Sequence, residues 1–202
     1  MKLYHAPTSP FVRKVVVLLH EAGALDQVAL IPAVGTPLAP GTMPVDRNPL
    51  GKIPALERDD GPTLYDSRVI TRYLDHTLQA GLYPAAPRLW DTLVIEATAD
   101  GIAEAALLMR FETALRSEPQ RSADWIEAQW AKVDRALAAL EQRWISHLSG
   151  PLDMGQIAVG CALDYLDLRH PDRAWGAGHP VLADWWTTFR ARPAMQATAP
   201  LA

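Results

Sequence analysis

One stretch constrains the fold more than any other part of the chain: Asn48–Ile70, with the sequence NPLGKIPALERDDGPTLYDSRVI. The stretch predicts a turn, a short apolar strand around Ile53–Leu56, a polar turn at Asp59–Pro62, a second short strand, and a helix that opens near Asp66-Ser67. Proline cannot donate to a sheet ladder, so a proline at the start of an apolar strand belongs at an edge, a strand start or a bulge. We therefore expect a β-hairpin that leads directly into a helix.

The same stretch also predicts a binding site. If the Ile53-Pro54 peptide bond is cis, the amide and carbonyl of Ile53 turn outward and can pair with an extended ligand. The helix that follows begins with two small polar residues, Asp66 and Ser67, and the free N–H groups of a helix start suit a carboxylate. Together these features predict a site for a small, peptide-like anion.

The residues before this stretch predict a small α/β unit. Lys2–His5 is expected to form a strand, and Ser9 followed by Pro10 is a typical helix start, with Ser9 as the N-cap. Gly23 is expected to end that helix, and Val28–Ile31 to form a second strand before a long loop. With the later hairpin and a helix over residues 67–78, the order is β-α-β-loop-β-β-α.

Strand signals almost vanish after a proline-rich segment, which we interpret as a linker at residues 81–86. Two long helices are expected to pair antiparallel, with buried faces formed by apolar residues at positions 90, 93, 94, 97, 101, 105 and 108, and at 126, 130, 133, 137, 140 and 144. Ile157–Leu163 is apolar all round and predicts a buried helix, whose start Asp153 and Gln156 mark as a capping box. A last helix is expected over Val181–Phe189.

Composition bounds the kind of protein. A hydrophobic content of 49%, with 21% charged residues and a net charge of −4, is ordinary for a globular protein and gives no reason to expect nucleic-acid or membrane partners. The single cysteine, Cys161, excludes an internal disulfide, and the six histidines show no metal-ligand spacing. Because the N-terminal residues lack the pattern of a secretory signal, we expect a cytoplasmic protein. From the spacing of the histidines we expect no bound metal.

The motifs together resemble the cytosolic glutathione S-transferase superfamily. The resemblance is carried by four segments in the family's order: Thr8–Lys14, Asn48–Leu56, Asp66-Ser67 and the capped helix after Pro151. It implies an α/β thioredoxin-like N-terminal domain at residues 1–80 and an all-α helical bundle at 87–202. It also implies that the protein is a homodimer that uses glutathione as co-substrate and a small apolar electrophile as second substrate.

The resemblance assigns site residues by position. Ser9 matches the catalytic serine of the tau-like members and the cysteine of the omega-like ones. By the same resemblance, glutathione would be bound by Ile53, Pro54, Asp66, Ser67 and Lys52, with Pro54 as the family's cis-proline. The chain departs from the family where Asp66 replaces the usual glutamate and where Asp153 and Gln156 replace the usual Ser/Thr and Asp of the capping box.

Ser9 is suited to stabilising a thiolate. A free thiol has a pKa of about 8.5, and lowering it by about two units requires roughly 2.7 kcal/mol of preferential thiolate stabilisation. A hydroxyl donor together with a helix N-terminus is of the right kind and size, and Thr8 is a neighbouring hydroxyl that could take the role. The serine argues against disulfide exchange, because that reaction needs an enzyme thiol at this position.

Simpler interpretations remain open for several residues. Ser9 and Asp66 could be helix caps only, and Arg13 is expected on a solvated face. Cys161 is expected to be packed and inert, and any of Leu107, Leu108, Phe111 or Trp175 could line the pocket for the second substrate. The alternative functions are a non-catalytic interaction protein on the same fold and a glutathione-dependent isomerase.

Overall fold

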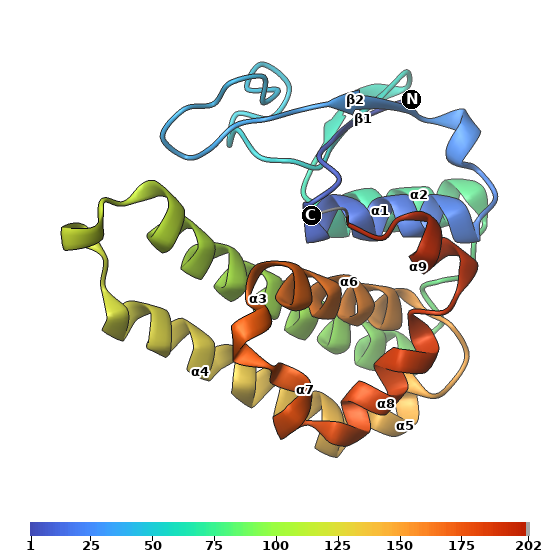
Figure 1. Ribbon diagram of the computed structural model, residues 1–202. Helices are drawn as coiled ribbons and strands as arrows, with labels where there is room; N and C mark the ends of the chain where they lie inside the picture. Colours follow the sequence, from blue (N-terminus) through green and yellow to red (C-terminus); the bar gives the residue numbers. More distant parts are fainter. Residues whose placement is uncertain (201–202) are drawn as a thin grey trace.

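The first part of the chain is a four-stranded sheet with its helices on the side that faces the rest of the molecule (Figure 1). A computed structural model describes residues 1–200. The elements of this part are β1 (Lys2–His5), α1 (Pro10–Glu21), η1 (Leu25–Gln27), β2 (Ala29–Pro32), β3 (Ala55–Arg58), β4 (Gly61–Leu64) and α2 (Ser67–Leu78). The predicted order of strands and helices is confirmed.

The sheet has the strand order β2-β1-β3-β4. The first two strands are parallel, as the crossover through α1 requires, and β3 runs antiparallel to both β1 and β4. The hairpin is shorter at its turn than the sequence predicted, because Gly61 and Pro62 belong to β4 and only Asp59 and Asp60 form the turn. Strand β3 likewise begins at Ala55, after the proline.

The second part is helical and packs against α1, and Arg68 and Arg72 of α2 form ion pairs with its first helix (Figure 1). Its elements are α3 (Arg88–Leu115), η2 (Glu118–Gln120), α4 (Ala123–Ala139), the π-helical turn η3 (Leu140–Trp144), α5 (Ile145–Leu148), α6 (Met154–Arg169), η4 (Pro171–Arg173), α7 (Trp175–Gly178), α8 (Pro180–Phe189) and α9 (Pro193–Ala197). No helix among residues 1–200 is long and apolar enough to cross a membrane.

Helix α6 is the centre of this part, as the sequence predicted. Its residues from Met154 to Leu166 are all buried, and the capping box of Asp153 and Gln156 is formed. The Asp153 carboxylate also accepts hydrogen bonds from Thr92, at 2.9 Å, and contacts His147 Nε2, at 2.6 Å. The cap therefore joins the start of α6 to two neighbouring helices.

The predicted buried face of α3 is wrong. Of the predicted positions only Ala105 is buried, whereas Trp90, Val94, Ala97, Gly101 and Leu108 are exposed. The helix instead buries a face that includes Ile95, Ala99, Ile102, Ala106 and Met109 against α6. The two helices approach each other closely on this face, since a Cβ added at Gly155 of α6 would lie 3.0 Å from Ile95 Cγ2. We call the exposed residues Trp90, Val94, Ala97, Gly101 and Leu108 the α3 outer stripe.

Candidate functional site

The sheet register brings the predicted site residues to one end of the first domain. Tyr4 pairs with Ala55 and Leu56 pairs with Leu64, so the next residues along these strands place His5, Pro54 and Asp66 in one row. Helix α1 begins shortly after β1 ends, and α2 begins directly after Asp66. Ser9, Ile53 and Ser67 are therefore each a few residues from the same row.

Ser9 is the N-cap of α1, and its hydroxyl keeps a free proton. Ser9 Oγ accepts a hydrogen bond from the Val12 amide at 3.3 Å, while Pro10 occupies the first helical position. Because Oγ acts as the acceptor in this bond, the hydroxyl hydrogen can still be donated to another atom. Thr8 makes no side-chain hydrogen bond among residues 1–200, and both side chains are partly exposed.

The loop before β3 is held by a residue whose role the sequence did not suggest. Asn48 is 2% exposed; its Nδ2 donates to the Lys52 carbonyl at 2.8 Å, and its Oδ1 accepts from the Leu50 amide at 3.1 Å. Gly51 has a φ of +60°, which glycine adopts without steric cost. The turn thus presents Lys52 and Ile53 in a fixed conformation.

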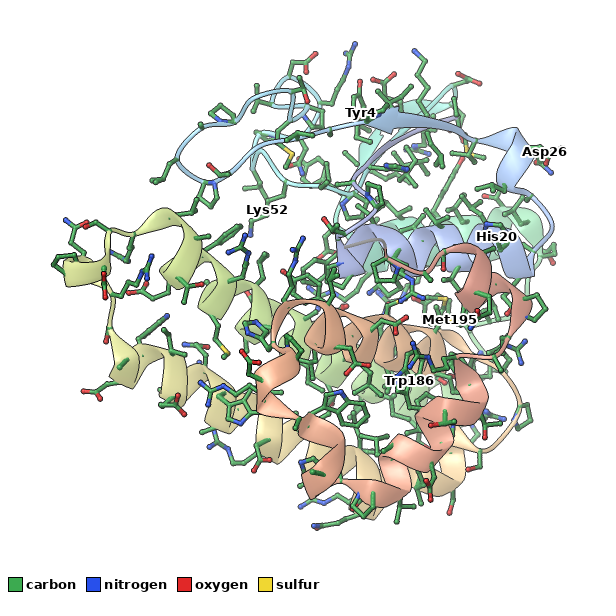
Figure 2. The ribbon with its side chains drawn as sticks, viewed as in Figure 1. Tyr4, His20, Asp26, Lys52, Trp186 and Met195 are labelled. Atoms are coloured by element: carbon green, nitrogen blue, oxygen red, sulfur yellow. The ribbon has the colours of Figure 1, made fainter. Side chains whose placement is uncertain are left out.

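The Ile53-Pro54 peptide bond is cis, as expected. Neither the amide nor the carbonyl of Ile53 makes a hydrogen bond within residues 1–200, so both are available to a ligand. Lys52 is exposed, forms no ion pair among the described residues, and lies on the loop nearest the helical domain in Figure 2. The backbone of Ile53 and the ammonium of Lys52 are thus both open.

Asp66 and Ser67 form the start of α2. The Asp66 side chain accepts a hydrogen bond from the Arg68 amide at 3.0 Å, and Arg68 Nη2 lies 3.0 Å from the other oxygen. Burial acts to raise the pKa of Asp66, but the hydrogen bonds and charge of Arg68, with the charge of Lys14, outweigh it and lower the pKa. Asp66 is therefore a carboxylate, 54% exposed and able to bind an ammonium group, next to a buried Ser67.

A buried charge network lies between this site and the helical domain, and the sequence analysis missed it. Lys14 is 1% exposed and contacts Glu96 Oε1 at 3.1 Å and Asp100 Oδ1 at 2.8 Å. The Tyr83 hydroxyl donates to Glu96 Oε2 at 2.9 Å, and burial raises the pKa of Tyr83. A lysine within the Val-rich run of α1 was the available signal, since a charge there must either reach solvent or find partners.

The expected exposure of Arg13 is wrong. The residue was expected on a solvated face, yet it is 4% exposed and forms an ion pair with Asp164 of α6. Its Nη2 donates to the Met195 carbonyl at 3.0 Å and its Nε to Thr198 Oγ1 at 3.2 Å. The guanidinium is buried because α6 and the C-terminal segment supply acceptors that a single-helix pattern cannot reveal.

The other residues named from the sequence lie either in the core or on the surface. Cys161 is buried, and burial raises its pKa to about 11, which agrees with an inert thiol. Trp175 is 6% exposed and its Nε1 donates to Asp167 at 2.7 Å, so it belongs to the core. Leu107 is half-buried against the core, whereas Leu108 is on the α3 outer stripe. Residues 1–200 contain no group of three or more His, Cys, Asp or Glu side chains arranged for a metal ion.

A thioredoxin-like domain with an open cis-proline edge, followed by a helical bundle, defines the class of protein as glutathione transferase-like. Family models described as the N-terminal and C-terminal domains of glutathione S-transferase match residues 8–77 and 123–186. A curated relative from Escherichia coli (strain K12), described as the uncharacterized GST-like protein YibF, is 31% identical over 204 residues, covering 99% of this chain and 98% of its own. The chain therefore belongs to the glutathione S-transferase superfamily.

Solved structures agree with this assignment. A glutathione transferase family member from Pseudomonas fluorescens Pf-5 with bound glutathione is 46% identical, covers 100% of this chain and 99% of its own, and superposes with a TM-score of 0.96. A second structure of a family member from the same organism contains S-(propanoic acid)-glutathione, with 45% identity, full coverage of both chains and a TM-score of 0.92. A Methylobacterium radiotolerans enzyme in complex with glutathione sulfonate is 32% identical, covers 100% of this chain and 95% of its own, and has a TM-score of 0.84.

Proposed function

We propose that the protein is a glutathione transferase that joins the glutathione thiolate to a small electrophile. The observation that carries the proposal is the state of Ser9, whose hydroxyl accepts from the first turn of α1 and keeps its own proton to donate. The glutathione sulfur beside Ser9 would receive that hydrogen bond together with the positive end of the helix dipole. Both interactions favour the thiolate over the thiol.

The rest of the tripeptide fits the open groups around Ser9. The backbone of Ile53 would pair with the cysteinyl amide and carbonyl, next to the cis-proline Pro54. Asp66 would bind the γ-glutamyl ammonium, and Ser67 with the first N–H groups of α2 would bind its carboxylate. Lys52 would reach the glycyl carboxylate. The relatives bound to glutathione and to a glutathione thioether support this use of the site.

The thiolate would attack an electrophilic carbon whose apolar body packs against the helical domain. We also propose that the protein is a cytoplasmic homodimer, and that the α3 outer stripe is the surface where the two copies meet. The support is the exposure of large apolar side chains there, with Trp90 63% and Val94 50% exposed. A groove of about 490 Å³ beside the stripe, lined in part by Gly101 and Leu108, would receive side chains of the second copy.

The test is Ser9→Ala, with Thr8→Val as the matched variant. The Ser9 variant should raise the pKa of bound glutathione by about one to two units and lower kcat/KM for conjugation about tenfold or more at neutral pH, because one hydrogen bond to the sulfur is lost. The thiolate absorbance of bound glutathione, titrated against pH, measures this directly. If only the Thr8 variant changes the titration, the role belongs to Thr8; if glutathione does not bind at all, the non-catalytic alternative replaces the enzyme.

A further inference from the structure

An open cavity of about 330 Å³ lies at the C-terminal end of α6 and is lined by residues of α3, α4, α6 and η4. Its basic lining comes from Arg110 on α3, Arg169 at the end of α6, and His170 and Arg173 beyond it. Such a concentration of guanidinium groups around one cavity contrasts with the net charge of −4 of the whole chain. The local positive charge therefore requires its own explanation.

Two of these charges have no acidic partner. Arg173 is neutralised by Glu127, whose Oε2 lies 2.9 Å from its Nη1, and it also lies over the ring of Trp130. Arg110 and Arg169, by contrast, form no ion pair with any acidic side chain of residues 1–200. The cavity consequently carries two uncompensated positive charges.

His170 does not add a third charge. Its Nε2 lies 2.9 Å from the Ala106 carbonyl, so the ring is held against α3 as a neutral donor. Burial lowers the pKa of His170, and the charges of Arg173, Arg110 and Arg169 lower it further. The ionic character of the cavity at neutral pH therefore comes from the arginines alone.

Arg110 and Arg169 lie at the end of the helical domain where α1 begins. Helix α1 packs on α3 and α6 through the ion pairs of Arg13 with Asp164 and of Lys14 with Asp100. The N-terminal end of α1 is at the same end of the molecule as the C-terminal ends of α3 and α6, as Figure 1 shows. Both guanidinium groups also act on the buried phenol of Tyr165, one turn before Arg169 on α6.

The other lining groups are the apolar side chains of Met109, Ile126 and Leu168, together with the Thr113 side chain. A ligand for such a cavity combines a small apolar body with one compact negative group. Guanidinium groups recognise carboxylates through paired N–H donors, and two of them at one cavity match a single carboxylate.

We propose that the second substrate of this enzyme is an electrophile that carries a carboxylate, held by Arg110 and Arg169. This inference rests on the proposed transferase function and gives its unknown electrophile a chemical class. A suitable probe is 4-chloro-3-nitrobenzoate: the glutathione thiolate forms a C–S bond at the chlorine-bearing carbon, the C–Cl bond breaks, and chloride leaves. No oxidant or reductant is needed.

The test compares this probe with its neutral analogue, 4-chloro-3-nitrobenzamide, each rate being divided by its uncatalysed rate with glutathione. The wild-type protein should prefer the benzoate in kcat/KM by about tenfold, and Arg110→Gln or Arg169→Gln should each reduce the preference about fivefold, because each lowers kcat/KM for the benzoate more than for the amide. Arg169→Lys keeps the charge and should retain part of the preference. The control is Arg135→Gln, an exposed arginine of α4 outside the cavity, which should change neither rate.

A binding measurement separates this inference from the transferase proposal. Calorimetric titration with the two purified conjugates should show tighter binding of the carboxylate conjugate, by a factor that falls as salt is added. Equal binding of both conjugates, or a preference that survives both glutamine substitutions, would overturn the carboxylate site while leaving the transferase proposal intact. If neither conjugate nor glutathione binds, both proposals are overturned together.

Discussion

Replacing Lys14 with methionine should destabilise the protein more than any surface charge substitution. Lys14 is 1% exposed, and its ammonium contacts Glu96, also 1% exposed, and Asp100, 18% exposed. Methionine has a similar volume but removes the nearest counter-charge of both carboxylates, which leaves Glu96 only Arg72 at 3.8 Å and Asp100 only Arg68 at 3.8 Å. Breaking a buried ion pair in this way costs about 3–5 kcal/mol of unfolding free energy. The matched control is Lys2→Met, because Lys2 is 60% exposed beside Glu57, and such a pair contributes less than about 1 kcal/mol.

The loss should depend on pH in a defined direction. Burial raises the pKa of Asp100 in the native protein, while the charge and hydrogen bonds of Lys14 oppose the rise. Without Lys14 the pKa of Asp100 rises further above its unfolded value, so the native variant holds a proton that the unfolded chain releases. Such a group contributes stability at low pH that is lost as pH rises through the raised pKa. The deficit of Lys14→Met should therefore be larger at about pH 7 than at about pH 5.

The assay is chemical denaturation of wild type and variants at both pH values, followed by tryptophan fluorescence. Adding Asp100→Asn to Lys14→Met should recover about 1 kcal/mol or more at neutral pH, since it removes one unpaired charge. A loss below about 1 kcal/mol, or a loss that is the same at both pH values, would refute the reasoning that Lys14 is a buried counter-charge.

Two further predictions follow from helices α6 and α3. Asp153→Ala removes the hydrogen-bond acceptor of Gln156, Thr92 and His147 at once and should lower the unfolding free energy by about 2–4 kcal/mol. The control, Asp184→Ala on the exposed face of α8, should have little effect. If the denaturation curves of the two variants coincide, Asp153 does not have the capping role. Val94→Glu should convert the proposed dimer to monomers in sedimentation velocity, because it places a charge in the α3 outer stripe, and an unchanged sedimentation coefficient would mean that the copies meet elsewhere or not at all.

The N-terminal half of the fold could be predicted because its signals are local. Ser9 before Pro10 marks a helix start whatever surrounds it, and the Asp66-Ser67 start of α2 was found to the residue. The hairpin turn was less accurate, because Gly61 and Pro62 favour turns by composition yet are accommodated in the edge strand β4. The roles of Ser9 and of the residues around Ile53 stay predictions until ligand binding is measured.

The helical half was harder because its helices are apolar on more than one side. Periodicity identified α3 as a helix but selected the wrong face, since large apolar residues such as Trp90 and Val94 outweigh the alanines that pack against α6. The charged contacts were missed for a related reason. Lys14 and Arg13 are adjacent in sequence, and the partners that bury them come from α3, α6 and the C-terminal segment, far away along the chain.

The contacts of Arg13 also have a consequence for the order in which the chain is made. Arg13 lies one turn after Ser9, yet two of its hydrogen bonds go to Met195 and Thr198. During synthesis the first domain leaves the ribosome long before these residues exist, so until then the Arg13 guanidinium lacks two of the acceptors that it has in the folded protein. The N-terminal half can therefore reach its final form only when almost the last residues of the chain have been translated.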